Sequence, residues 1–178
     1  MAATQRYSNV SIALHWLIAV LIIAAFILGN IMVDMRISPT KLKYFSYHKW
    51  LGVTVLAFVA VRLISRLMSK APPYPDNMGK AQTYLANGTH ILLYVLMFAV
   101  PLSGYFYTLA AGYPVVYLGL FELPVLIAPN PEIKDSLKEL HEILNKVMFV
   151  LVLLHIAAAL KHHFYDKDGL LNRMRPRI

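Results

Sequence analysis

The segment 140–163, LHEILNKVMFVLVLLHIAAALKHH, decides the fold. Its central part, from Val147 to Leu160, is apolar at every position except His155. A helix that crosses a bilayer needs about 20 mostly apolar residues, so this segment is long enough to span one. It nevertheless carries two ionisable side chains, His141 and His155, and such residues inside a span indicate a functional site.

Three further apolar segments precede this one, at 10–33, 45–68 and 84–110. Because backbone groups in lipid must bond within their own segment, we expect all four to be helices. The fourth helix begins at 131 or at 140, since Asn130-Pro131-Glu132 has the capping residue, the proline and the acid typical of a helix start. We therefore predict an all-α membrane protein, a four-transmembrane-helix bundle in one domain over 1–178.

The composition excludes several other classes of protein. Of the 178 residues 58% are hydrophobic and 15% are charged, against roughly 25% charged residues in soluble domains. The chain is therefore neither an ordinary soluble enzyme nor a disordered segment. The lack of cysteine excludes disulfides, iron–sulfur clusters and covalently attached c-type haem. We assign the net charge of +8 to contact with membrane lipid and expect no nucleic acid partner.

The distribution of basic residues predicts the orientation in the membrane. Four spans place both termini on one face, and that face, with the second connection, carries ten basic residues against seven on the other. The ten are Arg6, Arg62, Arg66, Lys70, Lys80, Lys161, Lys167, Arg173, Arg175 and Arg177. By the positive-inside rule, both termini lie in the cytoplasm.

The connection 111–129 on the opposite face is long and mostly apolar. Loops of this length without obvious structure are often functional. We expect it to lie over the mouth of the bundle or at the membrane interface.

Four histidines are predicted to form two pairs, one near each leaflet. At 14 residues apart, His141 and His155 share a helix face, about 40° short of four full turns and about 21 Å apart along the axis. His15 enters the first span to the depth of His155, and His48 enters the second span to the depth of His141. Topology and depth therefore give the pairs His15–His155 and His48–His141.

Two such sites stacked across a bilayer suggest two b-type haems, each held non-covalently between two imidazoles. Zinc is the rival metal, but it takes three or four ligands close together, which widely separated pairs supply poorly. Two histidine ligands leave the iron no open position, which favours electron transfer over ligand binding.

Two side chains near the cytoplasmic pair have alternative roles. Arg62, 14 residues after His48, is either a partner for a haem propionate or, like Arg66, extends to the membrane surface. His90 either replaces His15 as a ligand or is an interfacial residue bonded to a propionate or water, and we favour the second role.

Glycines recur at the same depths as the histidines. Gly29 and Gly104 each lie 14 residues after a histidine, and Gly52 lies one turn after His48. A missing side chain lets the edge of a macrocycle approach the backbone. The alternative is close helix–helix contact, for which small residues are also common.

A quinone site is suggested at the cytoplasmic end. His162, near the end of the last span, is suited to donate a hydrogen bond to a quinone carbonyl and to supply protons near neutral pH. Trp16, next to His15, is a candidate for the same pocket. The simpler roles are an interfacial cation for His162 and an aromatic-belt residue for Trp16.

The sequence resembles the bacterial cytochrome b561 family of small four-helix membrane cytochromes. The resemblance covers nearly the whole chain and keeps every histidine spacing described above. The matching stretches are Tyr7-Ser8, His15-Trp16, His48 with Gly52, Arg62 with Arg66, the proline-rich second connection, His90, Pro101-Leu102-Ser103-Gly104, Leu137 through His141-Glu142 to His155, Ala157-Ala158-Ala159-Leu160, His162-His163 and Lys167-Asp168-Gly169-Leu170-Leu171-Asn172-Arg173-Met174.

The resemblance implies a bacterial inner-membrane protein in which His15 and His155 hold the cytoplasmic-side haem b and His48 and His141 the periplasmic-side haem b. It further implies electron exchange with ubiquinone at the cytoplasmic side. One branch is similar to superoxide oxidases, whose quinone-side Trp and His fall on Trp16 and His162. The lysine of that branch reads Asn77 here, with Lys80 nearby.

These observations lead to a predicted superoxide:ubiquinone oxidoreductase. Lys41, Lys43 and Lys49 give a local positive field for an anion near His48, although that face sums to only about +1. The first alternative is a haem b anchor subunit that passes electrons from a partner dehydrogenase, docked at 111–129, to the quinone pool. The second is a haem-free, proton-coupled transporter with a histidine relay.

Overall fold

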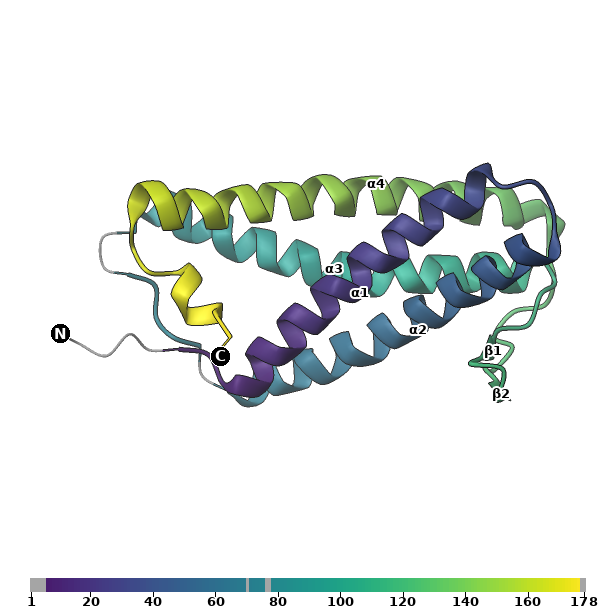
Figure 1. The fold of residues 1–178 in the computed structure, drawn as a ribbon, viewed down its shortest axis with the longest axis horizontal. Helices are drawn as coiled ribbons and strands as arrows, with labels where there is room; N and C mark the ends of the chain where they lie inside the picture. Colours follow the sequence, from purple (N-terminus) through teal and green to yellow (C-terminus); the bar gives the residue numbers. More distant parts are fainter. Residues whose placement is uncertain (1–5, 70, 76–77, 177–178) are drawn as a thin grey trace.

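The computed structural model describes residues 6–69, 71–75 and 78–176, and in that part of the chain it confirms the four-helix architecture (Figure 1). The long helices are α1 (Asn9–Asp34), α2 (Pro39–Met68), α3 (Lys80–Ala110) and α4 (Pro131–Lys161). Each is long and apolar enough to cross a membrane. A short π-helical turn, η1 (His162–Asp166), and a 3₁₀ turn, η2 (Leu171–Met174), follow α4.

Two helices begin earlier than hydropathy predicts. α2 starts at Pro39 instead of 45, because the Ser38 side chain accepts a hydrogen bond from the backbone N–H of Lys41 and proline follows it at the first helical position. α3 starts at Lys80 instead of 84, after Gly79. In contrast, α4 begins at Pro131 behind the Asn130 cap, as that motif predicts. The polar first turns of α2 and α3 therefore extend beyond the apolar spans.

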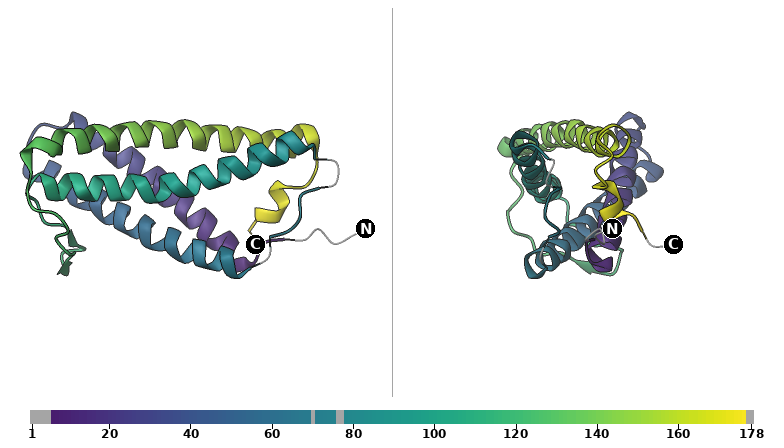
Figure 2. Two further views of the ribbon diagram at one scale, coloured as in Figure 1. Left: turned by 180° about the vertical axis from the view of Figure 1, so that it is seen from behind. Right: turned by 90° about the vertical axis from the view of Figure 1, so that its left-hand side faces the viewer.

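The helices pack mainly as the antiparallel pairs α1/α2 and α3/α4, with α2 also against α3. One apolar cluster is built on Ile18, Val55 and Val59, and a second on Leu96, Val100 and Met148. Ile22 and Met97 contact both clusters, so the core is continuous through the middle of the bundle. α1 begins and α4 ends at the same end of the molecule (Figure 2), hereafter the inner end; the other is the outer end.

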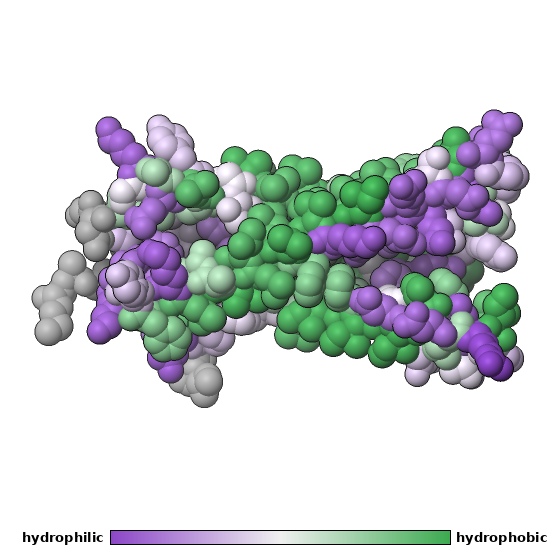
Figure 3. Space-filling model, turned by 90° about the horizontal axis from the view of Figure 1, so that it is seen from above, coloured by the Kyte–Doolittle hydropathy of each residue, from purple (hydrophilic) through white to green (hydrophobic). Residues whose placement is uncertain are grey.

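The sides of the bundle, between its two ends, have the apolar surface expected of a protein in lipid. Side chains such as Val150 and Leu154 are more than half exposed although they are apolar. Figure 3 shows apolar side chains over the middle of one face and most of the polar side chains toward its two ends. This is the pattern of a protein whose middle is surrounded by hydrocarbon.

The connection 111–129 contains a small hairpin instead of an irregular loop. Strand β1 (Val116–Tyr117) pairs antiparallel with β2 (Phe121–Glu122). The indole N–H of Trp50 in α2 donates to the carbonyl of Val116 at 2.7 Å, and Thr54 Oγ1 lies 2.8 Å from Tyr117 Oη. The hairpin is therefore docked beside α2, at the outer end of the bundle (Figure 1).

The C-terminal segment folds back across the inner end. After η1, Lys167 and Gly169 have positive φ and reverse the chain. The indole N–H of Trp16 then donates to the Met174 carbonyl at 2.8 Å, and Arg173 donates to the Pro73 carbonyl. Of the residues used in the charge count and the quinone comparison, Lys70, Asn77 and Arg177 lie outside the described residues.

Candidate functional site

The structure brings four histidines together as two facing pairs, one toward each end of the bundle. The ring centres of His15 and His155 are 6.3 Å apart, with planes at 69°. The ring centres of His48 and His141 are 6.2 Å apart, with planes at 84°. Each pair joins α4 to a helix with which α4 shares few backbone contacts, so the imidazoles face one another across the bundle interior.

These separations match those of imidazoles that share one metal ion from opposite sides. A metal–imidazole nitrogen bond is about 2.0–2.1 Å, and the ring centre lies about 1.1 Å from each nitrogen in a five-membered ring with bonds of about 1.33 Å. Two rings on opposite sides of one ion therefore have centres about 6.2–6.4 Å apart. The separations of both pairs, 6.3 and 6.2 Å, fall in this narrow range.

Each imidazole of the outer pair is oriented by a backbone carbonyl. His48 Nδ1 lies 3.0 Å from the Ala25 carbonyl, and His141 Nδ1 lies 3.0 Å from the Val100 carbonyl. A carbonyl only accepts, so Nδ1 carries the proton in both rings and Nε2 keeps its lone pair for a ligand bond. Such a bond from the second nitrogen is the usual support of a metal-binding histidine.

Ser103 adds a second oxygen beside His141. Its hydroxyl donates to the Val100 carbonyl at 2.8 Å, and its Oγ lies 3.0 Å from His141 Nδ1. Sequence reasoning noted Ser103 only as part of a matching stretch and gave it no role. A small polar residue beside Pro101 in an apolar span was the available signal.

Two glycines make room for the outer imidazoles themselves. A Cβ at Gly104 would lie 2.8 Å from His141 Cε1, and a Cβ at Gly29 would lie 3.2 Å from His48 Cε1. At these two positions the space beside the glycine is thus taken by an imidazole from a neighbouring helix. A Cβ at Gly52 would meet no atom within 4 Å, which leaves open space one turn from His48.

Two basic side chains, Arg62 and His90, lie beside the inner pair. The Arg62 guanidinium donates to Tyr94 Oη at 3.2 Å and to the Ser11 carbonyl at 2.9 Å, and this ties α2 to α3 and α1 beside His15. The ring centre of His90 lies 5.5 Å from that of His155. The Arg66 guanidinium lies over the Tyr7 ring, 5.2 Å from its centre.

Trp16 lies between the inner pair and a cavity. Its ring centre is 5.4 Å from that of His15. Together with Asn9, Ile12, Ala13 and Pro176, it lines a cavity of about 330 Å³. The indole N–H is occupied by the Met174 carbonyl, so it is not free to bond a molecule in this space.

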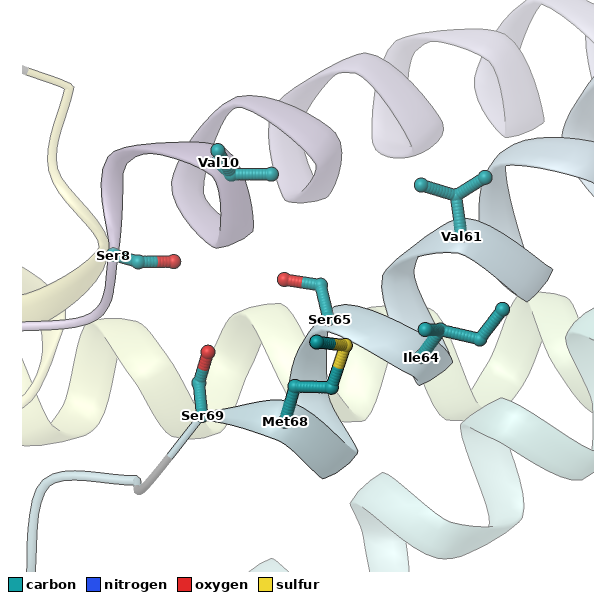
Figure 4. A pocket seen from close by; sticks show the side chains of 7 residues that line it. All are labelled: Ser8, Val10, Val61, Ile64, Ser65, Met68 and Ser69. Carbon is teal, nitrogen blue, oxygen red and sulfur yellow. The ribbon is translucent and has the colours of Figure 1, made fainter.

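A second cavity, of about 420 Å³, opens between the first turn of α1 and the last turns of α2 (Figure 4). Its lining combines hydroxyl groups with apolar side chains, and no histidine contributes to it. The lining residues are Ser8, Val10, Val61, Ile64, Ser65, Met68 and Ser69.

His162 is held by two carboxylates. Its Nδ1 lies 2.5 Å from Asp168 Oδ2 and 3.1 Å from Asp166 Oδ2, and the side chain of Asp168 is 4% exposed. Lys161 also bonds Asp166, at 2.6 Å. Among the described residues, His162 does not line the Trp16 cavity, so the structure does not bring these two predicted quinone residues into one pocket.

Of the lysines expected to attract an anion at the outer end, Lys41 is already engaged. Its ammonium group donates to the Met35 carbonyl at 2.6 Å and to the Val33 carbonyl at 3.3 Å, which caps the end of α1. Acidic neighbours also offset part of the charge there, with Lys138 paired to Glu142 at 3.7 Å. Bonds to neutral carbonyls leave the charge of Lys41 in place, so Lys41, Lys43 and Lys49 all contribute to the positive field at the outer end.

Comparison with known proteins agrees with this architecture. Residues 6–177 match the family described as prokaryotic cytochrome b561. The chain is 33% identical to cytochrome b561 homolog 2 of Escherichia coli K12, over 96% of this chain and 91% of the relative. It is 32% identical to cytochrome b561 homolog 1 of the same organism, over 97% and 98%. It is 28% identical to the probable superoxide oxidase CybB of Yersinia pestis, over 97% of each chain. The protein therefore belongs to the prokaryotic cytochrome b561 family of bacterial membrane electron-transfer proteins, which bind b-type haem.

Proposed function

We propose that this protein holds two b haems, the outer one between His48 and His141 and the inner one between His15 and His155. The observation that carries the proposal is the separation of 6.2 and 6.3 Å between the paired ring centres. Both values agree with two imidazoles on opposite sides of one iron, at about 6.2–6.4 Å. The open space at Gly52 offers room for a macrocycle edge beside the outer pair.

The same geometry favours His15 over His90 as the inner ligand. Rings on opposite sides of one iron cannot approach to the 5.5 Å that separates His90 from His155. Zinc fits poorly as well. Among the described residues, the group of three metal-binding side chains close enough to share an ion is His162, Asp166 and Asp168, and none of the four paired histidines belongs to it.

Haem b, when bound, supplies a reversible one-electron couple at each end of the bundle. The chain itself provides the rest: ligand rings fixed in place, and a close-packed apolar core between them that excludes water. The Arg62 guanidinium, with N–H groups beyond its bonds to Tyr94 and Ser11, is placed to pair with an inner propionate. His90 is placed as a further polar neighbour of that end.

We assign the electron acceptor, ubiquinone, to the cavity beside Trp16. Its volume of about 330 Å³ is that of a small-ligand pocket, which typically holds about 300–1,000 Å³. The indole face offers a stacking surface for a planar ring, close to His15. His162, oriented by Asp168, is the candidate proton donor at the same end of the bundle, outside the cavity lining.

The proposed donor is superoxide at the outer face. Two superoxide anions each give up one electron and leave as oxygen, while one ubiquinone takes up two electrons and two protons to form ubiquinol. Electron transfer of this kind needs no general base at the donor. Lys41, Lys43 and Lys49 supply a local attraction for the anion. The probable superoxide oxidase among the relatives supports this assignment. If the outer end faces the periplasm, where the donor is proposed to bind, both termini lie in the cytoplasm.

The decisive experiment counts haem in the purified protein and in four ligand variants. His48→Ala and His141→Ala should each lose the outer haem and keep the inner one, whereas His15→Ala and His155→Ala should do the reverse. One haem or none in the unchanged protein would refute the proposal. Stopped-flow mixing of the oxidised protein with superoxide tests the donor, because reduction of the haem band should follow. A haem-replete protein that superoxide leaves oxidised would refute the donor alone.

A further inference from the structure

The outer hairpin (residues 116–122) has an apolar tip on a strained turn. Leu118 and Gly119 both have positive φ, 53° and 74°. This is the pattern of a tight hairpin turn, where Asn-Gly or Asp-Gly is usual in water. A bulky residue such as Leu118 is an outlier in this conformation. The turn therefore keeps an apolar side chain at a position where a polar residue would fit the backbone better.

The side chains around the turn are exposed. Leu118 is 48% exposed, Leu120 is 78% exposed and Phe121 is 54% exposed. Glu122 is the sole charged residue in the whole connection 111–129. In water such a tip would be a liability, because it places a contiguous apolar patch on a protruding element.

The depth of the hairpin explains this choice of residues. The hairpin is fixed to α2 through Trp50 and Thr54, both inside the apolar segment 45–68. Trp50 lies about 10 Å on the outer side of the midpoint of that segment, at 1.5 Å per residue. The half-thickness of the hydrocarbon core is about 15 Å. The backbone that Trp50 holds therefore lies beside a span, at the level of the outer leaflet, and continues its lipid-facing surface.

We propose that this hairpin is an interfacial membrane wedge, with Leu118, Leu120 and Phe121 inserted among the lipids of the outer leaflet. Part of its backbone is satisfied without water, because β1 pairs with β2 and the Val116 carbonyl accepts from Trp50, and the boundary between headgroups and acyl chains supplies polar partners for the rest. Apolar side chains of an interfacial element typically enter about 5–10 Å into the boundary between headgroups and acyl chains. Lipid, and not a partner dehydrogenase, is then the occupant of this apolar surface.

The lack of cysteine makes the test direct, because each introduced cysteine is unique. A nitroxide label at Leu120→Cys, in protein reconstituted into phospholipid vesicles, reports its collisions with oxygen, which concentrates in lipid, and with a water-soluble nickel complex. Val150→Cys, 54% exposed in the middle of α4, is the lipid control. Asp135→Cys, whose side chain is 81% exposed near the start of α4, is the water control.

We expect the label at 120 to show an oxygen-to-nickel collision ratio several-fold above that at 135 and close to that at 150. A ratio like that at 135 would place the tip in water and overturn the proposal. Protection from both reagents would show that protein covers the tip and would also overturn the proposal. In vesicles the covering protein would be a second copy of this chain, and in native membranes it would be a partner. As a second test, Leu120→Lys should shift the ratio at Leu118→Cys toward water, whereas Leu120→Ala should shift it less.

Discussion

The contact between Gly104 and His141 allows a quantitative test of the outer site. Substitution by alanine would place a Cβ 2.8 Å from His141 Cε1 and 3.1 Å from Nδ1. Carbon atoms in contact are normally about 3.5–4.0 Å apart, so the overlap is about 0.7 Å or more. The ring has little freedom to move aside, because Nδ1 is bonded to the Val100 carbonyl and lies beside Ser103.

Overpacking of this kind typically costs about 1–3 kcal/mol. In the haem-free protein the ring can still relieve the overlap by giving up its bond to the Val100 carbonyl, whereas a ring bound to haem cannot turn, so the remaining cost falls on the haem-bound state. Since about 1.4 kcal/mol is a tenfold change in affinity, Gly104→Ala should weaken binding of the outer haem by roughly 5- to 150-fold. Gly29→Ala should have a smaller effect on the same haem, because its Cβ would lie 3.2 Å from the His48 ring.

The assay is haem content per chain, with low-temperature electron paramagnetic resonance to distinguish the two low-spin haems. Gly88→Ala is the matched control, since it lies in the same helix and its Cβ would meet no atom within 4 Å. That change should leave both haems in place and stabilise α3 by about 0.5–1 kcal/mol. The reasoning is refuted if Gly104→Ala keeps the haem content and the resonance signals of Gly88→Ala.

Three further predictions concern single side chains. His90→Ala should retain both haems by pyridine haemochrome assay, because the 5.5 Å separation from His155 does not fit an iron-bridged pair; loss of the inner haem would make His90 the ligand. Ser103→Ala should raise the midpoint potential of the outer haem in a redox titration, by roughly 40 mV if the lost interaction is worth about 1 kcal/mol, while an unchanged potential would show that the Val100 carbonyl alone sets the ring. Arg62→Gln should lower the potential of the inner haem and leave the outer one unchanged, because a positive charge next to the site favours the reduced form; equal shifts in both would indicate a general change in packing.

The spacing and depth of the histidines were enough to predict the two facing pairs, and capping motifs predict where the helices begin. Spacing on one helix and depth on two others were enough to predict which rings face each other, because a straight helix fixes both face and rise. The same motif logic that found the start of α4 at Asn130-Pro131 applies to Ser38-Pro39, where the search for apolar residues overlooked it. Hydropathy marks where lipid begins, whereas a cap marks where the helix begins.

What the sequence did not reveal depends on contacts between distant residues. Hydrogen bonds from Trp50 and Thr54 hold the hairpin in place, and a hydrogen bond from Trp16 holds the C-terminal segment. Neither set of contacts leaves a periodic pattern in the sequence. The glycines were predicted to make room either for a macrocycle edge or for close helix–helix contact, and the groups that Gly29 and Gly104 approach are the imidazoles of His48 and His141 on neighbouring helices. Spacing placed these glycines at the right depth, but only the tilt of the helices decides which group fills the space.

The two ends of the bundle differ in ways that predict different potentials for the two proposed haems. At the outer end, His48 and His141 each donate Nδ1–H to a carbonyl, which makes the rings stronger donors and would stabilise the oxidised iron of a haem bound there. In the part of the chain that the structure describes, only this pair carries such bonds. At the inner end, the Arg62 guanidinium donates to the Ser11 carbonyl, one helical turn before His15, and a positive charge there would stabilise the reduced form of a haem. The outer site should therefore have the lower potential, so that electrons run inward to the quinone. A redox titration of the His→Ala variants assigns each potential to one end, and a higher potential at the outer end would contradict this polarity.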